Sequence, residues 1–217
     1  MVADIGIGPH NLAALAERSY EVRGDYPSLL FEGGWHSSGE LLQRSRRIAA
    51  GLGELGIGPG ERVVVTMANC PEVAILYQAI WRAGAVVTPA TFLLPPEDLR
   101  HIVADAEAAA VVTTPEFVDK VQAAVAGVPS VRAVICTGDA APGVTPLESL
   151  ERAQPAAIVD RDDSDLAALL YTGGTTALCC RPCSWISDRN ACGSNHRSSA
   201  ATPCSSACMP TIVTNSP

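Results

Sequence analysis

The sequence predicts an α/β fold, with βαβ units around a mainly parallel sheet, followed by a disordered tail. Two observations lead to this prediction. Short β-branched and apolar runs alternate with amphipathic stretches as far as Tyr171, and strands that alternate with helices are joined by right-handed crossovers in one parallel sheet. After Thr176 this alternation stops, and Ser, Thr, Pro and Cys dominate, a composition that predicts disorder.

The first long helix is predicted over Gly39–Leu55. Its apolar residues recur on one face at helical spacing, whereas Arg44 and Arg47 fall outside that face. Glycines around Pro59 end the helix and turn the chain. The next segment, Arg62–Ala68, is mostly β-branched and apolar, which is typical of a strand buried on both faces.

The next helix is predicted over Pro71–Arg82, because Asn69 or Cys70 can cap it and proline is favoured in the first turn. A shorter helix is predicted at the start of the chain, over Asn11–Arg18. We predict further strands over residues 85–89, 109–113, 131–136 and 166–171, helices over 95–106 and 115–126, a surface loop over 138–144, a helical turn over 146–152, and an acidic linker over 160–165.

The charge and hydropathy of the chain argue against a nucleic-acid-binding or membrane-spanning protein. The net charge is −8 and the pI is near 4.9, whereas a surface that binds nucleic acid needs a basic stripe. The most apolar stretch, Val73–Leu94, is interrupted by Gln78, Arg82, Gly84 and Pro89, and no secretory signal is visible. We therefore expect a cytoplasmic protein.

Composition also divides the chain into two parts near residue 176. Residues 1–176 have a net charge of −10 and residues 177–217 a net charge of +2, and six of the eight cysteines lie in the second part. We therefore predict a partial α/β domain over residues 1–176 and an unrelated Cys-, Ser- and Pro-rich tail over residues 177–217.

A glycine- and threonine-rich run, Tyr171-Thr172-Gly173-Gly174-Thr175-Thr176, directly follows the last predicted strand. Glycines allow a tight turn that points backbone N–H groups inward, and the threonine hydroxyls add further donors. Such a concave site suits phosphate oxygens. The spacing is not that of a Walker loop, and a plain strand connection is the alternative interpretation.

This run resembles the start of the phosphate signature of the adenylate-forming superfamily, which usually reads Y-T-S-G-T-T-G-x-P-K-G. Several upstream segments resemble the same superfamily in the same order along the chain. They are Gly39–Leu41, Arg46–Ala49, Leu55–Val63, Asn69–Glu72, Ala83–Pro89 and Val111–Thr114. The acyl-CoA ligase branch, and fatty-acid–CoA ligases within it, fit better than the luciferase or peptide-synthetase branches.

The resemblance implies a two-step ligase reaction. A carboxylate attacks the α-phosphate of ATP to give an acyl-adenylate and pyrophosphate, and the thiol of coenzyme A then displaces AMP. The glycine-rich loop and Mg²⁺ would stabilise the charge of the leaving pyrophosphate. The residues implied as ATP-phosphate ligands are Thr172, Gly173, Gly174, Thr175 and Thr176.

The sequence departs from the superfamily pattern directly after Thr176. The pattern continues with Gly and then Pro-Lys-Gly, whereas this chain reads Ala177-Leu178-Cys179-Cys180-Arg181. Arg181 does not stand in the position of the missing lysine and does not replace a compact ammonium. The later superfamily motifs are also missing. We therefore expect no catalytic residue in this chain and a truncated, inactive product.

Two functional hypotheses follow from these observations. The chain is a fatty-acid–CoA ligase family member that activates acids with ATP, or it is a non-catalytic remnant. A remnant would bind nucleotide weakly, or associate with an intact relative or with chaperones. The apolar strand over residues 166–171 would then be left with an exposed edge.

Two weaker patterns in the sequence resemble cofactor sites, one for flavin and one for zinc. Gly6–Leu12 resembles a flavin-binding fingerprint, but Met1–Ile5 is too short and polar for the strand that should precede it. A glycine-rich connection to the first helix is the preferred interpretation. His10 and His36 are expected at the surface without partners.

The tail contains a second candidate site, for zinc. Its Cys and His residues fall into close pairs, which zinc sites use. The pairs are Cys180 with Cys183, Cys192 with His196, and Cys204 with Cys208. The spacing fits no zinc module that we recognise, so we expect no metal site and interpret the tail as the product of a frameshift or rearrangement.

Overall fold

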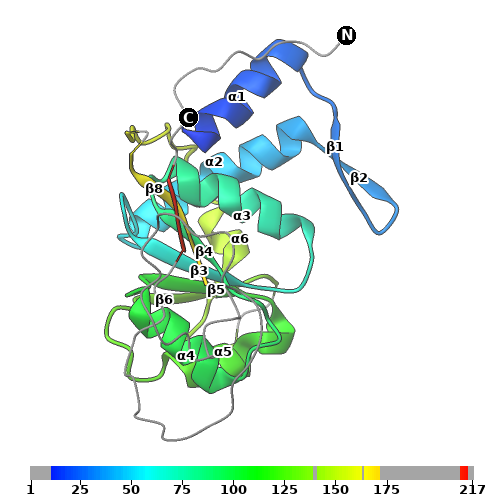
Figure 1. The fold of residues 1–217 in the computed structure, drawn as a ribbon. Helices are drawn as coiled ribbons and strands as arrows, with labels where there is room; N and C mark the ends of the chain where they lie inside the picture. Colours follow the sequence, from blue (N-terminus) through cyan, green and yellow to red (C-terminus); the bar gives the residue numbers. More distant parts are fainter. Residues whose placement is uncertain (1–10, 139–140, 163, 172–210, 215–217) are drawn as a thin grey trace, which may run out of the picture. The chain divides into compact units, whose positions relative to one another are not determined.

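A seven-stranded sheet forms the centre of the fold (Figure 1). The computed structural model describes residues 11–138, 141–162, 164–171 and 211–214, the last as backbone only. The strand order is β7-β6-β5-β3-β4-β8-β9. The bounds are β3 Arg62–Thr66, β4 Val86–Pro89, β5 Ala110–Thr113, β6 Ala133–Cys136, β7 Thr145–Pro146, β8 Leu166–Leu170 and β9 Thr211–Thr214.

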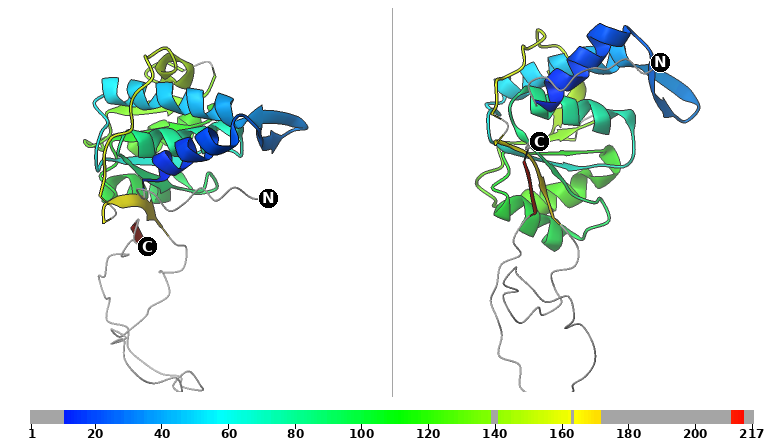
Figure 2. Two further views of the ribbon diagram at one scale, coloured as in Figure 1. Left: turned by 90° about the horizontal axis from the view of Figure 1, so that it is seen from above. Right: turned by 45° about the horizontal axis from the view of Figure 1, so that its top comes forward.

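Six of these strands are parallel, as the alternation of strands and helices predicts, and only β9 runs antiparallel to its neighbour. Helices cover both faces of the sheet (Figures 1 and 2). One face carries α2 (Ser38–Glu54), α3 (Pro71–Arg82) and α6 (Leu147–Leu150). The other face carries α4 (Pro96–Asp105) and α5 (Val118–Val125).

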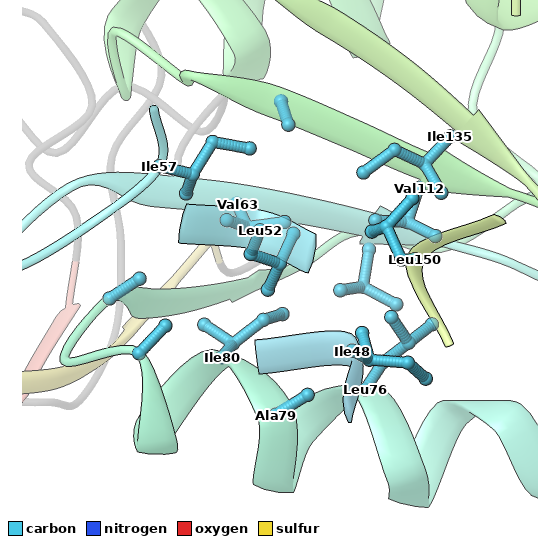
Figure 3. Packing of buried hydrophobic residues seen from close by; sticks show 14 of the residues in the cluster. Ile48, Leu52, Ile57, Val63, Leu76, Ala79, Ile80, Val112, Ile135 and Leu150 are labelled. Atoms are coloured by element: carbon cyan, nitrogen blue, oxygen red, sulfur yellow. The ribbon is translucent and has the colours of Figure 1, made fainter. Parts of the chain in front are cut away.

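Strand β3 shows why helices are needed on both faces. Val63 and Val65 pack among α2 and α3, whereas Val64 packs among α4 and α5. All three side chains are buried, which confirms the prediction from the unbroken apolar run. Figure 3 shows the first of these clusters, in which Leu52 from α2 and Ile80 from α3 meet the sheet.

Two close approaches in this core require glycine. A Cβ at Gly51 in α2 would lie 2.5 Å from the Cβ of Leu150 in α6. At Gly84, which follows α3, φ is +72° and a Cβ would lie 2.9 Å from Cγ1 of Val159. Gly84 is therefore required for two reasons, because it adopts a left-handed backbone conformation and because Val159 packs directly against it.

A helix and a hairpin precede the sheet. Helix α1 (Leu12–Arg23) packs on α2 and α3, and the antiparallel strands β1 (Pro27–Phe31) and β2 (Gly34–Ser37) project beside it (Figure 2). Asn11 caps α1 by accepting a hydrogen bond from the Ala13 amide at 2.9 Å. The hairpin was not predicted, although glycines between two apolar runs are a usual hairpin signal.

A single carboxylate joins three helices at this end of the structure. Glu17 of α1 accepts hydrogen bonds from Arg46 of α2, at 3.0 Å from its Nε, and from Arg82 of α3. The Arg82 side chain is only 2% exposed. Because Ala13 is the only described residue of α1 that is buried, this ion cluster is a major attachment of the helix.

The predicted strands and helices of residues 39–171 are confirmed, with small changes at their ends. The first helix extends to Arg23 rather than Arg18. The helix predicted from Pro115 begins as a 3-10 turn, η1 (Pro115–Phe117). A short strand, β7, was also missed.

Within the tail that is predicted to be largely disordered, the structure describes one strand, β9 (Thr211–Thr214), which pairs with β8. The β-branched sequence Thr-Ile-Val-Thr suits a strand, and the free N–H and C=O groups of an edge strand give it a partner. The edge of β8, which we expected to be exposed, is therefore covered in this structure. Residues 177–210 lie outside the described part of the chain.

Replacing Glu17 by Gln should lower the free energy of unfolding by about 1–3 kcal/mol, because Arg82 would remain buried without a carboxylate. Burial by itself raises the pKa of Glu17, but the hydrogen bonds from Arg82 and Arg46 outweigh it and hold this pKa below the ordinary 4.5. The stabilisation is therefore present above about pH 4.5 and is lost as the pH falls below that value.

Urea unfolding at several pH values measures this effect. Glu54→Gln, at an exposed position near the end of α2, serves as the control and should change little at any pH. A Glu17→Gln variant with the stability of the parent protein at pH 7 would contradict the prediction.

Removing residues 211–217 should expose the edge of β8 and increase self-association, because Leu166–Leu170 would lose its antiparallel partner. Light scattering at increasing protein concentration measures this. Removal of residues 215–217 alone is the control and should leave the association state unchanged. Equal scattering by the two shortened chains would show that β9 does not protect the edge.

Candidate functional site

A cavity of about 360 Å³ lies at the carboxyl ends of β3, β4 and β8, on the side that carries α3. Most of its lining is apolar, and a few polar side chains join it. The lining residues are Val65, Met67, Asn69, Val73, Tyr77, Pro89, Ala90, Thr91, Phe92 and Leu170.

The topology explains why a site forms at this edge. After β3 the chain enters α3 on one face of the sheet, and after β4 it enters α4 on the other face. Connections that leave neighbouring parallel strands toward opposite faces open a crevice outside the carboxyl ends, where α/β proteins bind their ligands. Asn69 and Thr91 lie in these two connections.

Tyr171 stands at this edge, directly after β8. Its hydroxyl donates to Oδ2 of Asp105 at the end of α4, over 2.6 Å. The strand is also held from the other face, because Nε1 of Trp81 in α3 donates to the Ala167 carbonyl at 2.9 Å. Both ends of β8 are thus fixed to helices before the glycine-rich run begins.

The predicted phosphate ligands follow Tyr171 immediately. Thr172, Gly173, Gly174, Thr175 and Thr176 lie outside the described residues, as do the departures at Ala177–Arg181. Their role therefore stays a prediction. The structure places the strand that leads into them beside the cavity, since Leu170 is one of the lining residues.

Two ionisable groups near the cavity are held in their neutral forms. Burial raises the pKa of the Tyr77 hydroxyl. Burial also raises the pKa of the Cys70 thiol, and the neighbouring Glu72 carboxylate adds to the effect. A thiol with a raised pKa is a poor nucleophile, so Cys70 has the character of a structural residue at the start of α3.

Sequence reasoning did not single out Tyr77 or Thr91 as residues of the cavity, or Asp105 as the partner of Tyr171. Thr91 follows a predicted strand, and its position at a carboxyl end was a usable signal. Asp105 and Tyr77 lie within helices, and only the packing of α4 and α3 against the sheet brings Asp105 to Tyr171 and Tyr77 to the cavity.

The structure also bears on the metal site, the flavin-like run and the histidines considered from the sequence. Among the residues that the structure describes, no three His, Cys, Asp or Glu side chains are arranged to hold a metal ion, and the Cys and His pairs of the tail lie outside them. Of the flavin-like run, Asn11 and Leu12 are described, and they begin α1. The expectation that His36 has no partner is wrong, because its Nδ1 lies 3.4 Å from Oε1 of Glu40.

Within the described residues, no helix combines the length and the apolar character that a membrane crossing requires.

Comparison with known proteins extends these observations. A family model described as AMP-binding enzyme matches residues 16–178. Rice (Oryza sativa subsp. japonica) 4-coumarate–CoA ligase 5 is 37% identical over 145 residues, which cover 65% of this chain and 26% of the relative. A medium/long-chain-fatty-acid–CoA/3-oxocholest-4-en-26-oate–CoA ligase of Mycolicibacterium smegmatis is 25% identical over 175 residues, covering 77% of this chain and 32% of the relative.

Solved structures agree with the sequence comparisons. A benzoate CoA ligase from Burkholderia xenovorans LB400 superposes with a TM-score of 0.68 at 28% identity, covering 74% of this chain and 32% of that one. The chain thus spans only about a quarter to a third of the lengths of these relatives.

Replacing Tyr171 by Phe should lower the free energy of unfolding by about 0.5–1.5 kcal/mol, because the hydrogen bond to Asp105 is lost at a partly exposed position. Asp105→Ala should cost a similar amount, and the double variant less than the sum of the two, since both changes remove one interaction. Urea unfolding of the four proteins measures the coupling. Strict additivity would show that the two side chains do not interact.

Proposed function

The chain belongs to the AMP-binding enzyme family, and on that premise we propose that residues 11–176 supply part of the ATP site of an acid–CoA ligase. The observation that carries this proposal is the position of Tyr171. It stands at the carboxyl end of a parallel strand, beside a cavity, and directly before the glycine- and threonine-rich run. Backbone N–H groups and hydroxyls in such a position suit the phosphates of ATP.

The proposed reaction has two steps. An oxygen of the acid carboxylate forms a bond to the α-phosphorus of ATP. The bond between that phosphorus and the oxygen that bridges it to the β-phosphorus breaks, and pyrophosphate leaves. The thiol of coenzyme A then loses its proton to solvent, and its sulfur forms a bond to the acyl carbon. The bond between that carbon and the phosphate oxygen breaks, and AMP leaves with its electron pair. Mg²⁺, when bound, would neutralise charge on the phosphates.

In this proposal the chain's own residues hold and orient the nucleotide. Thr172, Gly173, Gly174, Thr175 and Thr176 would donate hydrogen bonds to the leaving phosphates. Tyr171, fixed by Asp105, would set where that loop begins. The described residues supply no set of carboxylates for Mg²⁺, so no ligand for the metal is assigned.

The acid is proposed to be a fatty acid, and the relative from M. smegmatis supports this choice. The rice relative, at higher identity, is named for 4-coumarate, an aromatic acid. An aromatic acid is therefore the competing substrate class. A cytoplasmic location also remains part of the proposal.

We further propose that the 217-residue polypeptide alone does not complete the reaction. After Thr176 the sequence lacks the lysine of the superfamily pattern, and Arg181 is out of register with it. Positioned charge contributes most of the rate acceleration in such a transfer. The second candidate function is thus a non-catalytic remnant that binds nucleotide weakly or associates with an intact relative.

Pyrophosphate release separates these two functions. With ATP, Mg²⁺, coenzyme A and a panel of fatty acids, 4-coumarate and benzoate, the polypeptide should release no more pyrophosphate than a reaction without acid. Turnover that depends on one acid would refute the remnant function and would identify the substrate class.

Restoring the phosphate signature tests whether this segment is a nucleotide site. The variant Ala177→Gly, Cys179→Pro, Cys180→Lys, Arg181→Gly should bind MgATP at least about tenfold more tightly than the parent polypeptide, a change of about 1.4 kcal/mol for one added charge-assisted contact. Isothermal titration calorimetry measures the dissociation constant of MgATP for both proteins.

The matched control carries Ala at position 180 in place of the introduced lysine, with the other three changes kept. It should bind no more tightly than the parent polypeptide. Tight, magnesium-dependent ATP binding by the unchanged polypeptide would overturn the view that its phosphate site is incomplete.

A further inference from the structure

A second cavity, of about 260 Å³, lies between α1, α2, α3 and the first strand of the hairpin. It is separate from the carboxyl edge of the sheet and plays no part in the proposed ligase reaction. Its lining residues are Ala16, Ser19, Tyr20, Tyr26, Ser28, Ser38, Leu41, Leu42, Ser45, Ala74 and Gln78.

Hydroxyl groups are concentrated in this lining. Ser19 Oγ and Tyr26 Oη lie 3.4 Å apart and share a hydrogen bond. Ser38 Oγ accepts from the Tyr26 amide at 3.1 Å, and Ser45 Oγ donates to the Leu42 carbonyl at 2.8 Å. Each of these oxygens retains capacity for one further hydrogen bond.

No charged side chain is among the lining residues. Asp25, which is bonded to the lining residue Ser38, already accepts from the Gly39 amide at 2.8 Å and from Ser38 Oγ at 3.2 Å. Glu17, on the same helix as Ser19, is engaged by two arginines. An ion in the cavity would lose its hydration without gaining a counter-charge, so the cavity favours an uncharged occupant.

Gln78 of α3 adds an amide side chain to this lining. Its Oε1 is buried without a hydrogen-bond partner. A hydroxyl group both donates and accepts, so it satisfies the amide in either orientation of its oxygen and nitrogen.

The remaining lining is apolar. Leu41, Leu42, Ala16 and Ala74 contribute aliphatic surface, and the rings of Tyr20 and Tyr26 add aromatic surface. The volume corresponds to roughly nine water molecules at about 30 Å³ each, and thus to a single substituted ring rather than a nucleotide. Apolar walls with a few convergent polar groups are typical of small-molecule sites.

We propose that this cavity binds a small uncharged molecule of the phenol type, with its hydroxyl group on Gln78 and its ring between the tyrosines and the leucines. Helix α1 forms one wall, and the ion cluster at Glu17 holds it in place. The site is independent of ATP and of the phosphate loop.

Titration of the full-length, ¹⁵N-labelled polypeptide with phenol tests this proposal. Saturable shifts should appear at amides of α1, α2 and α3 and not at the carboxyl edge of the sheet. Toluene, which lacks the hydroxyl, and benzoate, which carries a charge, should each bind at least about tenfold more weakly.

Two variants locate the site. Ala16→Phe fills the cavity and should abolish the shifts, whereas Ala14→Phe, on the same helix and outside the lining, should leave phenol binding unchanged. Gln78→Leu keeps the volume and should weaken phenol about tenfold while leaving toluene unaffected. Melting curves of all three variants identify any that does not fold. If a phenylalanine variant does not fold, the effect of Gln78→Leu on phenol binding decides whether the cavity is the site.

Three results would overturn the proposal. They are no saturable binding of phenol, equal binding by phenol and toluene, or equal loss in Ala16→Phe and Ala14→Phe when both fold. The first would mean that the cavity holds only water.

Discussion

Burial of the central parallel strands on both faces is the constraint on which this structure depends. In β3 successive valines point into different clusters, and every one is buried. A sheet of this kind is stable only when helices cover both sides. The chain must therefore cross between faces as it passes from strand to strand, with α3 on one side and α4 and α5 on the other.

That crossing also determines where chemistry can occur. The connections that leave β3 and β4 toward opposite faces open a crevice at the carboxyl edge, and β8 brings Tyr171 to the same edge. The strand is held by Trp81 from one helix and by Asp105 from another. The run that follows is proposed to bind phosphates, and these two hydrogen bonds fix the strand from which it starts.

The outer layer is held differently. Helix α1 has a single buried residue among those described, and it depends on a carboxylate shared by two arginines. Because little apolar surface is buried beneath α1, a cavity lined by hydroxyls remains there. The small apolar contact of α1 thus has two consequences. The helix depends on the ionised Glu17, whose charge changes with pH, and a cavity remains beside it.

Much of the fold was predictable from the sequence. The helix over Pro71–Arg82 was located at both ends, because a proline in the first turn and apolar periodicity are local signals. The unbroken apolar run of β3 predicted burial on both faces. The hairpin was missed because its strands are short and half-exposed, with Leu30 and Trp35 54% and 62% exposed, so they lack the alternation that a buried strand shows.

The sequence by itself determined the secondary structure of residues 39–171, the α/β class and the family, because each depends on order and spacing along the chain. Only the tertiary structure decided that β5 and β4 flank β3, that Tyr171 meets Asp105 across 66 positions, and that Glu17 reaches Arg82. Local periodicity reports which face of an element is buried, but the partner on that face is selected by the packing of the whole chain. The phosphate ligands at Thr172–Thr176 remain a prediction.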